Sequence, residues 1–498
     1  MLTSLSLPPF NYLIINFITF SLFFLFLYKK LKKNQNHKLY FFYGWLFGFG
    51  YFATNLYWIS ISLTFDRNFE FLIPLTIIII PSFLAIFYGL VSYLFFIFKS
   101  KRVVISILIF SLIFAIIEFV RGSILTGFPW NLLVFSFSNH LEVLSIISII
   151  GTYGFNLLCI TLFISPVTLI LYDTKKDIFL FVLSILIITS FYTFGLSYKE
   201  KFKKAEYIKY NYKIRIISSN ISLERFYSET DPTSIIQDLI KISNPNLKEK
   251  TIFVWPEGII PNSFQESFYE FKELFSTNFN ENHFLILGIS RQQTDNDLVR
   301  IFNSLSVYDN ELNLLHSYDK INLVPFGEFL PIENFFKIIG FKSLTNNYQS
   351  FSSGDKRDII YFNQKKISLK ILPLICYEII YSGKLFKKKD FDLILNISED
   401  GWFGQSIGPK QHFVHSIFRA IESGKYVVRS ANNGISAVVD PLGNIEQSVD
   451  YEQSGYIDLV GQKKIQPTIF SRYGNKIFGL LILLYIFLIF SFNKIRNE

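Results

Sequence analysis

Three ionisable side chains stand directly after apolar runs of the chain. Glu257 follows IFVWP, Cys376 follows ILPLI, and Lys320 lies in YDK just ahead of INLVPFGE. Apolar, β-branched runs of this length predict strands, and catalytic groups gather at the carboxyl ends of strands in α/β sheets. Each residue alone has an ordinary interpretation, as a surface glutamate, a solvated lysine or a buried cysteine. Together they suggest one site.

The chemistry that these three types support is acyl transfer. A thiol must lose its proton to attack a carbonyl, and a nearby carboxylate can accept that proton. The oxyanion that develops needs fixed donors, such as an ammonium and a backbone N–H. We therefore predict Glu257 as base, Cys376 as nucleophile, and Lys320 with the Tyr377 N–H as oxyanion donors. This chemistry implies no cofactor and no metal.

The remaining cysteine usage fits this role. The chain holds two cysteines, and Cys159 lies within an apolar run, where we expect a packed small residue. Cys376 is the only cysteine of the polar half, so an internal disulfide is excluded there. A single cysteine in an exported domain is either buried and inert or a working thiol.

The composition indicates a membrane protein. Half of the residues are hydrophobic and 17% are charged, against roughly 25% charged in soluble proteins. A water-soluble fold could not hide so much apolar surface. The net charge of +9 does not indicate nucleic acid as a partner, because the basic residues are scattered or flank apolar runs, as topology signals do.

Seven apolar segments are long enough to cross a bilayer of about 30 Å. They lie near 9–28, 39–65, 71–98, 103–120, 139–172, 178–198 and 474–493. The fifth is too long for one upright helix, so part of it should be interfacial or re-entrant. We expect three parts: a bundle of about six spans over 1–198, an exported catalytic domain with linkers over 199–473, and a C-terminal helix with a short cytoplasmic tail over 474–498.

Basic residues set the expected orientation. They follow the first, third, fifth and last segments, and such loops face the cytoplasm. The N-terminus and residues 199–473 then lie outside the cytoplasm. The lysines of 199–204 are an exception on the predicted outer side.

The polar insert alternates strands and helices, which indicates a layered α/β domain. Expected strands cover 212–218, 251–255, 283–289, 301–308, 368–375, 391–397, 425–430 and 434–440, and expected amphipathic helices cover 263–278 and 409–423. The segment 332–354 is too apolar for an ordinary loop. It is either core or an arm that touches the bilayer.

Several motifs resemble the nitrilase superfamily and, within it, the membrane-bound apolipoprotein N-acyltransferase family. The most specific are KINLVPFGEFLP from Lys320, ICYEI around Cys376, GWFGQSIGPKQH from Gly401 and RSANNG from Arg429. TGFPW from Thr126, with Glu118 and Arg121 upstream, also resembles this family. The resemblance spans nearly the whole chain and implies a four-layer αββα sandwich beside a membrane bundle.

The resemblance implies a fatty acyl transfer through a thioester on Cys376. The donor would be a phospholipid and the acceptor the N-terminal amine of a diacylglyceryl-cysteine lipoprotein, with both substrates held in the bilayer. It implies the bacterial inner membrane as location, with the catalytic domain on the periplasmic side. It gives Glu257 and Lys320 the roles above. It adds Glu328, Tyr377, Glu378 and Trp402 as supporting or substrate-binding residues.

Two departures from the family pattern stand out. The chain resembles the family from its second span onward, with SLPPF from Ser6 at the start of that helix. Either the first span is absent or a misassigned start codon gives this appearance. Where the family has a Trp a few residues after Asn220-Ile221, the nearest aromatic here is Phe226. An aromatic face is therefore expected at this substrate contact without an indole N–H.

Two further pairs of residues could carry chemistry, and two other functions are compatible with parts of the sequence. His412 and His415 have metal-ligand spacing on a predicted helix, but no clustered cysteine or third histidine supports a site. Glu118 and Arg121 are either a structural ion pair or residues of the substrate path. The alternative enzyme is a membrane-tethered nitrilase-type amidase, which the three residues alone do not exclude. A transporter or receptor is disfavoured, because the sequence shows no inverted repeats.

Overall fold

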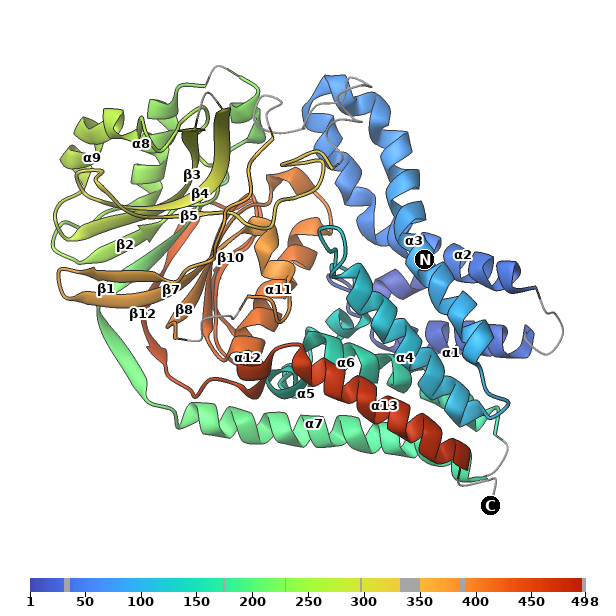
Figure 1. Cartoon of the computed structure of the whole chain (residues 1–498). Coiled ribbons are helices and arrows are strands. Elements are labelled where there is room, and N and C mark those ends of the chain that lie inside the picture. Colours follow the sequence, from blue (N-terminus) through green and yellow to red (C-terminus); the bar gives the residue numbers. More distant parts are fainter. Residues whose placement is uncertain are drawn as a thin grey trace.

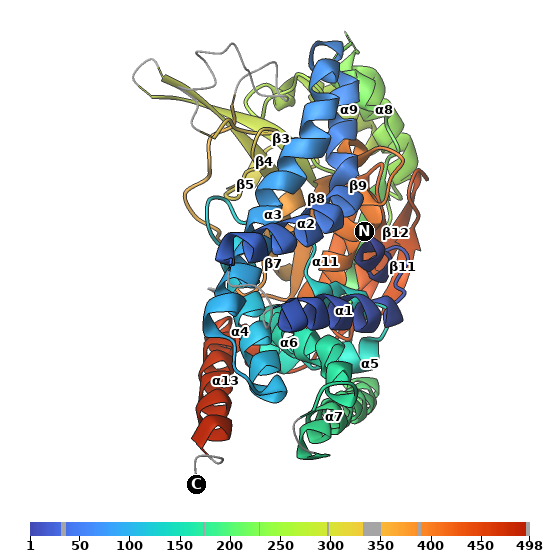
Figure 2. The same cartoon turned by 90° about the vertical axis from the view of Figure 1, so that its right-hand side faces the viewer.

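The computed structural model describes residues 1–30, 36–172, 175–228, 230–295, 298–331, 350–385 and 390–494. Figure 1 shows a helical bundle beside a part built on two β-sheets, and Figure 2 gives the view at a right angle. The bundle consists of α1 (Ile14–Lys30), α2 (His37–Leu56), α3 (Ile73–Phe98), α4 (Val103–Arg121), α5 (Leu141–Leu144), α6 (Ile147–Ile164), α7 (Phe179–Lys203) and α13 (Lys476–Lys494).

Each of the seven apolar segments contains helix. Among the described residues, five helical stretches are long and apolar enough to cross a membrane: Arg67–Phe98, Val103–Arg121, Ile147–Leu169, Phe179–Lys203 and Lys476–Asn493. The helix of the first segment starts only at Ile14 and has 17 residues. That of the second ends at Leu56 and continues as 3₁₀ turns to Phe65. The helices of these two segments are therefore not among the five that are long and apolar enough to cross a membrane.

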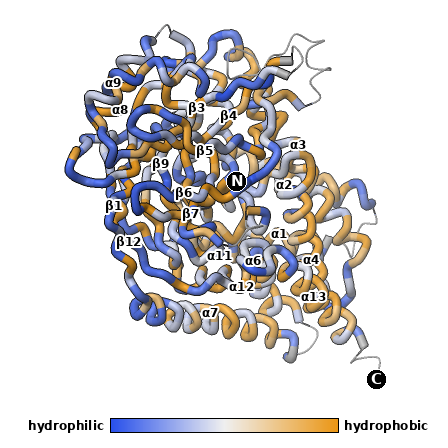
Figure 3. Tube along the Cα trace, turned by 60° about the vertical axis from the view of Figure 1, so that its left-hand side comes forward, coloured by the Kyte–Doolittle hydropathy of each residue, from blue (hydrophilic) through white to orange (hydrophobic). Residues whose placement is uncertain are grey.

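The bundle has a buried centre and an apolar outside. The span window of α6 is 83% buried, whereas those of α7 and α13 are each 11% buried. The apolar colouring of α13 and of much of α7 in Figure 3 is therefore outward-facing surface. Such surface suits hydrocarbon and not water.

The long segment 139–172 is broken, as its length predicted. After the short α5, α6 is interrupted at Gly151, whose φ of 70° and ψ of 173° are not helical. A Cβ there would lie 2.0 Å from the ring of Phe470, so the close approach also requires glycine.

Two six-stranded mixed sheets form the second part. Their orders are β12-β1-β2-β3-β4-β5 and β11-β10-β9-β8-β7-β6. The strands are β1 (Tyr207–Ser218), β2 (Thr251–Val254), β3 (His283–Asp295), β4 (Leu298–Asp309), β5 (Leu314–Asp319), β6 (Ile360–Gln364), β7 (Ile367–Ile375), β8 (Leu393–Glu399), β9 (Tyr426–Asn432), β10 (Ser436–Val439), β11 (Ile445–Val449) and β12 (Gly455–Lys463). Each sheet has a parallel centre, β1-β2-β3 in one and β7-β8-β9 in the other.

The predicted strands are all present, and four more were missed. β5, β6, β11 and β12 are edge or outer strands whose exposed polar positions weaken the apolar signal. The helix expected over 263–278 is wrong in its first part, because helical structure starts only at Phe268 and α9 covers Lys272–Asn278. The helix α8 (Pro232–Ser243), capped by Asp231, was also missed.

Four layers follow from the packing. One apolar core joins the two sheets through residues such as Ile216, Val254, Ile371 and Leu395. A second core packs α8 and α9 on the outer face of the first sheet. α11 (Gly408–Ser423) covers the second sheet, so the αββα sandwich is confirmed.

α11 also joins the sandwich to the bundle. Every residue from Gln411 to Ser423 is buried, because one face of α11 packs on the sheet and the other on the bundle. Glu422 accepts hydrogen bonds from the backbone N–H and hydroxyl of Thr152, at 2.8 and 2.6 Å, and from Ser382, at 2.6 Å. The broken helix at Gly151 is what frees the Thr152 N–H for this contact. Arg419 pairs with Glu422 at 2.8 Å.

Replacing Glu422 should therefore weaken the contact between α11 and the bundle. Glu422→Ala leaves the buried Arg419 charge and three donors without their acceptor, a loss of roughly 3–5 kcal/mol for a broken buried pair. The melting temperature of the full chain in detergent should fall clearly. The control is Glu311→Ala, whose side chain is 57% exposed and pairs loosely with Lys272. Equal melting temperatures for the two variants would contradict the assignment.

Candidate active site

The carboxyl ends of the strands bring the predicted residues to one edge of the sandwich. Glu257 stands three residues after β2, Lys320 directly after β5 and Cys376 directly after β7. The first two belong to one sheet and the cysteine to the other. The site therefore forms only where the two sheets face each other.

Lys320 lies between two carboxylates. Its ammonium donates to Glu257 Oε1 at 3.1 Å and to Glu328 Oε1 at 2.9 Å, and its side chain is only 1% exposed. Asn303, in the middle of β4, donates its amide to the same two oxygens at 2.7 and 2.8 Å. The second oxygen of Glu328 accepts from the Val324 N–H at 2.8 Å, which fixes this carboxylate.

The charge state of Lys320 follows from these neighbours. Burial alone would lower the pKa of Lys320, but the carboxylates of Glu257 and Glu328 raise it well above its ordinary value. Lys320 is therefore a permanent cation at neutral pH. A fixed cation is what an oxyanion donor must be.

Cys376 occupies a strained turn. It is partly buried, and its φ of 47° is in the left-handed region that a non-glycine residue rarely adopts. Cys376 is the first residue of a short 3₁₀ segment, Cys376–Ile380, which follows β7 directly. Such local strain is typical of functional sites.

The thiol is protonated at neutral pH. Removal from water raises the pKa of Cys376 well above its ordinary value, and the negative charge of Glu257 raises it further, while Lys320 lowers it. A second buried acid, Asp400, acts in the same direction as Glu257. A thiol in this state needs a base before it can act as a nucleophile. Glu257 is the carboxylate beside it that also contacts Lys320.

Glu378 holds the cysteine turn against the lysine loop. Its carboxylate accepts from the Ile375 N–H at 3.0 Å, from the Ile321 N–H at 3.0 Å and from the Tyr318 hydroxyl at 2.8 Å. Arg357 pairs with the same carboxylate. With its acceptor oxygens fully engaged and its side chain buried, Glu378 positions Cys376 and Lys320 relative to each other.

Tyr377 points into the bundle. Its hydroxyl donates to the Gly127 carbonyl at 2.8 Å, and Tyr381 donates to the Thr126 carbonyl at 2.8 Å. Arg121 donates to the Phe128 carbonyl of the same loop and pairs with Glu118. Both members of this pair are almost fully buried, which favours their interpretation as a structural pair.

An aromatic contact lies beside the site at the junction with the bundle. Trp402 stacks on Phe226, with ring centroids 5.7 Å apart, and meets Phe65 edge to face at 5.9 Å. Phe226 thus comes to the place where the motif predicted an aromatic face. Phe226 comes from the loop after β1 of the first sheet, Trp402 from the loop after β8 of the second sheet, and Phe65 from the 3₁₀ turns after α2.

Sequence reasoning missed a layer of supporting residues. The Glu399 N–H donates to Glu257 Oε2 at 2.9 Å, and the Glu399 carboxylate pairs with Arg225 and accepts from Asn432 at 2.8 Å. These residues and Asn303 lie far apart in the sequence, so spacing held no signal for them. Two clues were available: Glu399 stands two residues beyond the strand expected over 391–397, and Asn432 lies within the RSANNG motif.

The two histidines of α11 have other partners. His412 Nδ1 lies 2.9 Å from Asp400, which also binds Arg429 at 2.7 Å. Burial lowers the pKa of His412 and, more strongly, that of His415. Within the described ranges no group of three metal-ligating side chains occurs. Of the apolar segment 332–354, residues 332–349 lie outside the described residues.

Comparisons with known proteins cover both parts. The family model for the apolipoprotein N-acyltransferase N-terminal domain matches residues 1–165, and that for carbon-nitrogen hydrolase matches residues 234–466. The apolipoprotein N-acyltransferase of Rickettsia prowazekii is 33% identical over 94% of this chain and 92% of its own. That of Rhodopseudomonas palustris is 30% identical over 98% and 92%. Among solved structures, an amidase from Nesterenkonia sp. AN1 has a TM-score of 0.35 and 13% identity, over 51% of this chain and 91% of its own.

The charges around the thiol predict a specific reactivity. Because the Glu257 charge raises the pKa of Cys376, Glu257→Gln should lower that pKa and increase the thiolate fraction at a given pH. Iodoacetamide should then alkylate Cys376 several-fold faster at pH 8 in Glu257→Gln than in the native protein. In the native protein the rate should still be rising above pH 9.

Intact-mass analysis over time measures this rate, with Cys376→Ala as the blank for any alkylation of Cys159. A slower reaction of Glu257→Gln than of the native protein would show that the carboxylate does not act on this thiol as described.

Proposed function

Because the chain belongs to the apolipoprotein N-acyltransferase family, we propose that it transfers a fatty acyl chain from a phospholipid to the N-terminal amine of a diacylglyceryl-cysteine apolipoprotein. The observation that carries this proposal is the placement of Cys376 where the charges of Glu257 and Lys320, which bond each other, act on its thiol. The turn that holds Cys376 is hydrogen-bonded to a loop of the bundle. Substrates that are held in a bilayer require an active site next to the membrane-spanning helices.

In the first half-reaction Glu257 accepts the thiol proton as Sγ of Cys376 attacks the ester carbonyl of the phospholipid. The developing oxyanion is stabilised by the Lys320 ammonium and the Tyr377 N–H. The C–O bond of the ester then breaks, and Glu257 returns the proton to the departing alkoxide. A lysophospholipid leaves, and Cys376 carries the acyl group as a thioester.

In the second half-reaction the lipoprotein amine attacks the thioester carbonyl. The same two donors hold the second oxyanion, and Glu257 accepts a proton from the amine. The C–S bond breaks, an amide forms, and the thiolate of Cys376 regains a proton from Glu257. Exclusion of water before the amine arrives protects the thioester from hydrolysis.

The remaining site residues have supporting roles in this proposal. Glu328 holds Lys320 in place, Glu378 and Tyr377 position the cysteine turn, and Trp402 with Phe226 contacts the lipid or peptide substrate. No cofactor takes part. The division into a bundle over 1–198, a catalytic domain over 199–473 and a C-terminal helix with its tail over 474–498 belongs to the proposal.

A membrane-tethered amidase with water as the second nucleophile is the alternative. It would use the same three residues. The contact with the bundle favours transfer. Tyr377 and Tyr381, which follow the proposed nucleophile, donate hydrogen bonds to a loop of the bundle, and an enzyme acting on a soluble amide would need no such contact.

The two half-reactions should separate experimentally. Native protein incubated with phospholipid and no amine should gain one fatty acyl mass, and a diacylglyceryl peptide should remove it. Cys376→Ala and Cys376→Ser should form no adduct, and Lys320→Ala should slow its formation by roughly 10² to 10³. Cys159→Ala is the matched control and should acylate normally.

Intact-mass spectrometry follows every step. Discharge by water as fast as by the lipopeptide would favour the amidase. Full acylation of Cys376→Ala would refute the site itself.

The proposed location is the bacterial inner membrane, with the catalytic domain on the periplasmic side. Basic loops after four of the apolar segments support this orientation. A cysteine placed at Glu270, in the cysteine-free surface of the first sheet's helical layer, should react with a membrane-impermeant maleimide in intact spheroplasts. One placed at Lys38 should react only after lysis. Protection of position 270 in intact spheroplasts would reverse the orientation.

A further inference from the structure

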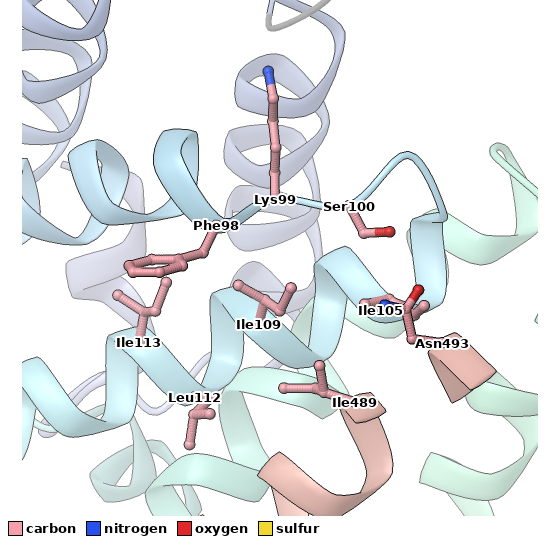
Figure 4. A pocket seen from close by; sticks show the side chains of 9 residues that line it. All are labelled: Phe98, Lys99, Ser100, Ile105, Ile109, Leu112, Ile113, Ile489 and Asn493. Atoms are coloured by element: carbon pink, nitrogen blue, oxygen red, sulfur yellow. The ribbon is translucent and has the colours of Figure 1, made fainter. Parts of the chain in front are cut away.

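A groove of about 470 Å³ lies between α4, the end of α3 and α13 (Figure 4). It is far from the active-site edge, at the end of the bundle where the C-terminus lies in Figure 1. Its walls are apolar, with Ile109 and Ile113 of α4 facing Phe98 of α3 and Ile489 of α13. Ser100 and Asn493 lie together at one end and give the groove a polar mouth.

The polar mouth is positively charged. The turn 99–102 carries Lys99, Lys101 and Arg102, and no acidic residue follows in the sequence before Glu118. The Lys99 ammonium lies over the Phe96 ring, 4.9 Å from its centroid, and points away from the groove in Figure 4, so Lys101 and Arg102 are the charges at the mouth. Arg102 donates to the Phe492 carbonyl at 2.5 Å, which brings its charge beside Asn493 at the end of α13. Lys101 is exposed. The Ser106 hydroxyl, which donates to the Ser100 carbonyl at 2.7 Å, fixes the turn on α4.

We propose that this groove binds an anionic phospholipid, with one acyl chain along α4 and the phosphate at the turn 99–102. A groove in the lipid-facing side of a bundle is filled by hydrocarbon, since apolar walls give water no hydrogen bonds. Basic mouths between membrane helices select anionic headgroups. The site is separate from the acyl donor site at Cys376. The mouth of the groove lies at the Val103 end of α4, whereas the loop that contacts Tyr377 follows the Arg121 end.

The test uses the full chain in phosphatidylcholine vesicles with a trace of photoactivatable lipid. The probe is either phosphatidylglycerol or phosphatidylcholine with a diazirine in the acyl chain, and labelled peptides are mapped by mass spectrometry. In the native protein the anionic probe should label α4 and α13 at least ten-fold more than the zwitterionic probe. Equal labelling by both probes would overturn the proposal.

Two pairs of variants sharpen this result. Lys101→Gln with Arg102→Gln should remove most of the preference, at about five-fold for each charge. The equally charged pair Lys201→Gln with Lys203→Gln, at the end of α7, should leave it intact. Ile109→Trp fills the groove and should reduce labelling by both probes, whereas Leu186→Trp on the exposed side of α7 should not.

Unchanged labelling in Ile109→Trp would also overturn the proposal. The acyl adduct on Cys376 should form in all four variants, so loss of lipid at the groove is distinguished from loss of the acyl donor.

Discussion

The active-site edge depends on one buried cation between two carboxylates. Moving the Lys320 ammonium out of water is costly, and only good geometry offsets that cost. Glu257 and Glu328 supply the opposite charges, and Asn303 completes the hydrogen bonds of both carboxylates. Since Glu257 stands after β2 and both Lys320 and Glu328 follow β5, this cluster ties two loops of one sheet into a single edge.

The same cluster also affects the pKa of Cys376, the proposed nucleophile. A lysine neutralised by two carboxylates does little to stabilise a thiolate nearby, so the pKa of Cys376 stays high despite the adjacent cation. Cys376 is therefore a thiol at rest, and in the proposed mechanism a thiolate forms only as Glu257 removes the proton. A resting thiolate would be oxidised or alkylated more readily, so the high pKa protects the proposed nucleophile.

Much of this arrangement was predictable from local sequence, and the limits were physical. The apolar strands before Glu257 and Cys376 and the motif after Lys320 located the three residues, since buried parallel strands leave a strong signal. Asn303, Glu399 and Arg225 act only through contacts between distant segments. The outer strand β11 has no buried residue and so leaves no apolar signal. β12 pairs with the distant β1, and nothing in the local sequence predicts that contact.

The contacts between the two parts explain why the sandwich needs its bundle. α11 would be amphipathic in a soluble sandwich, with a polar face in water, yet here its outer side carries Gln411, His415 and Glu422 into buried contacts with the bundle. On the side of the candidate active site, Tyr377 and Tyr381 donate hydrogen bonds to the loop after α4. The residue after Cys376 is therefore positioned by the bundle, so the proposed active site and the bundle form one structural unit.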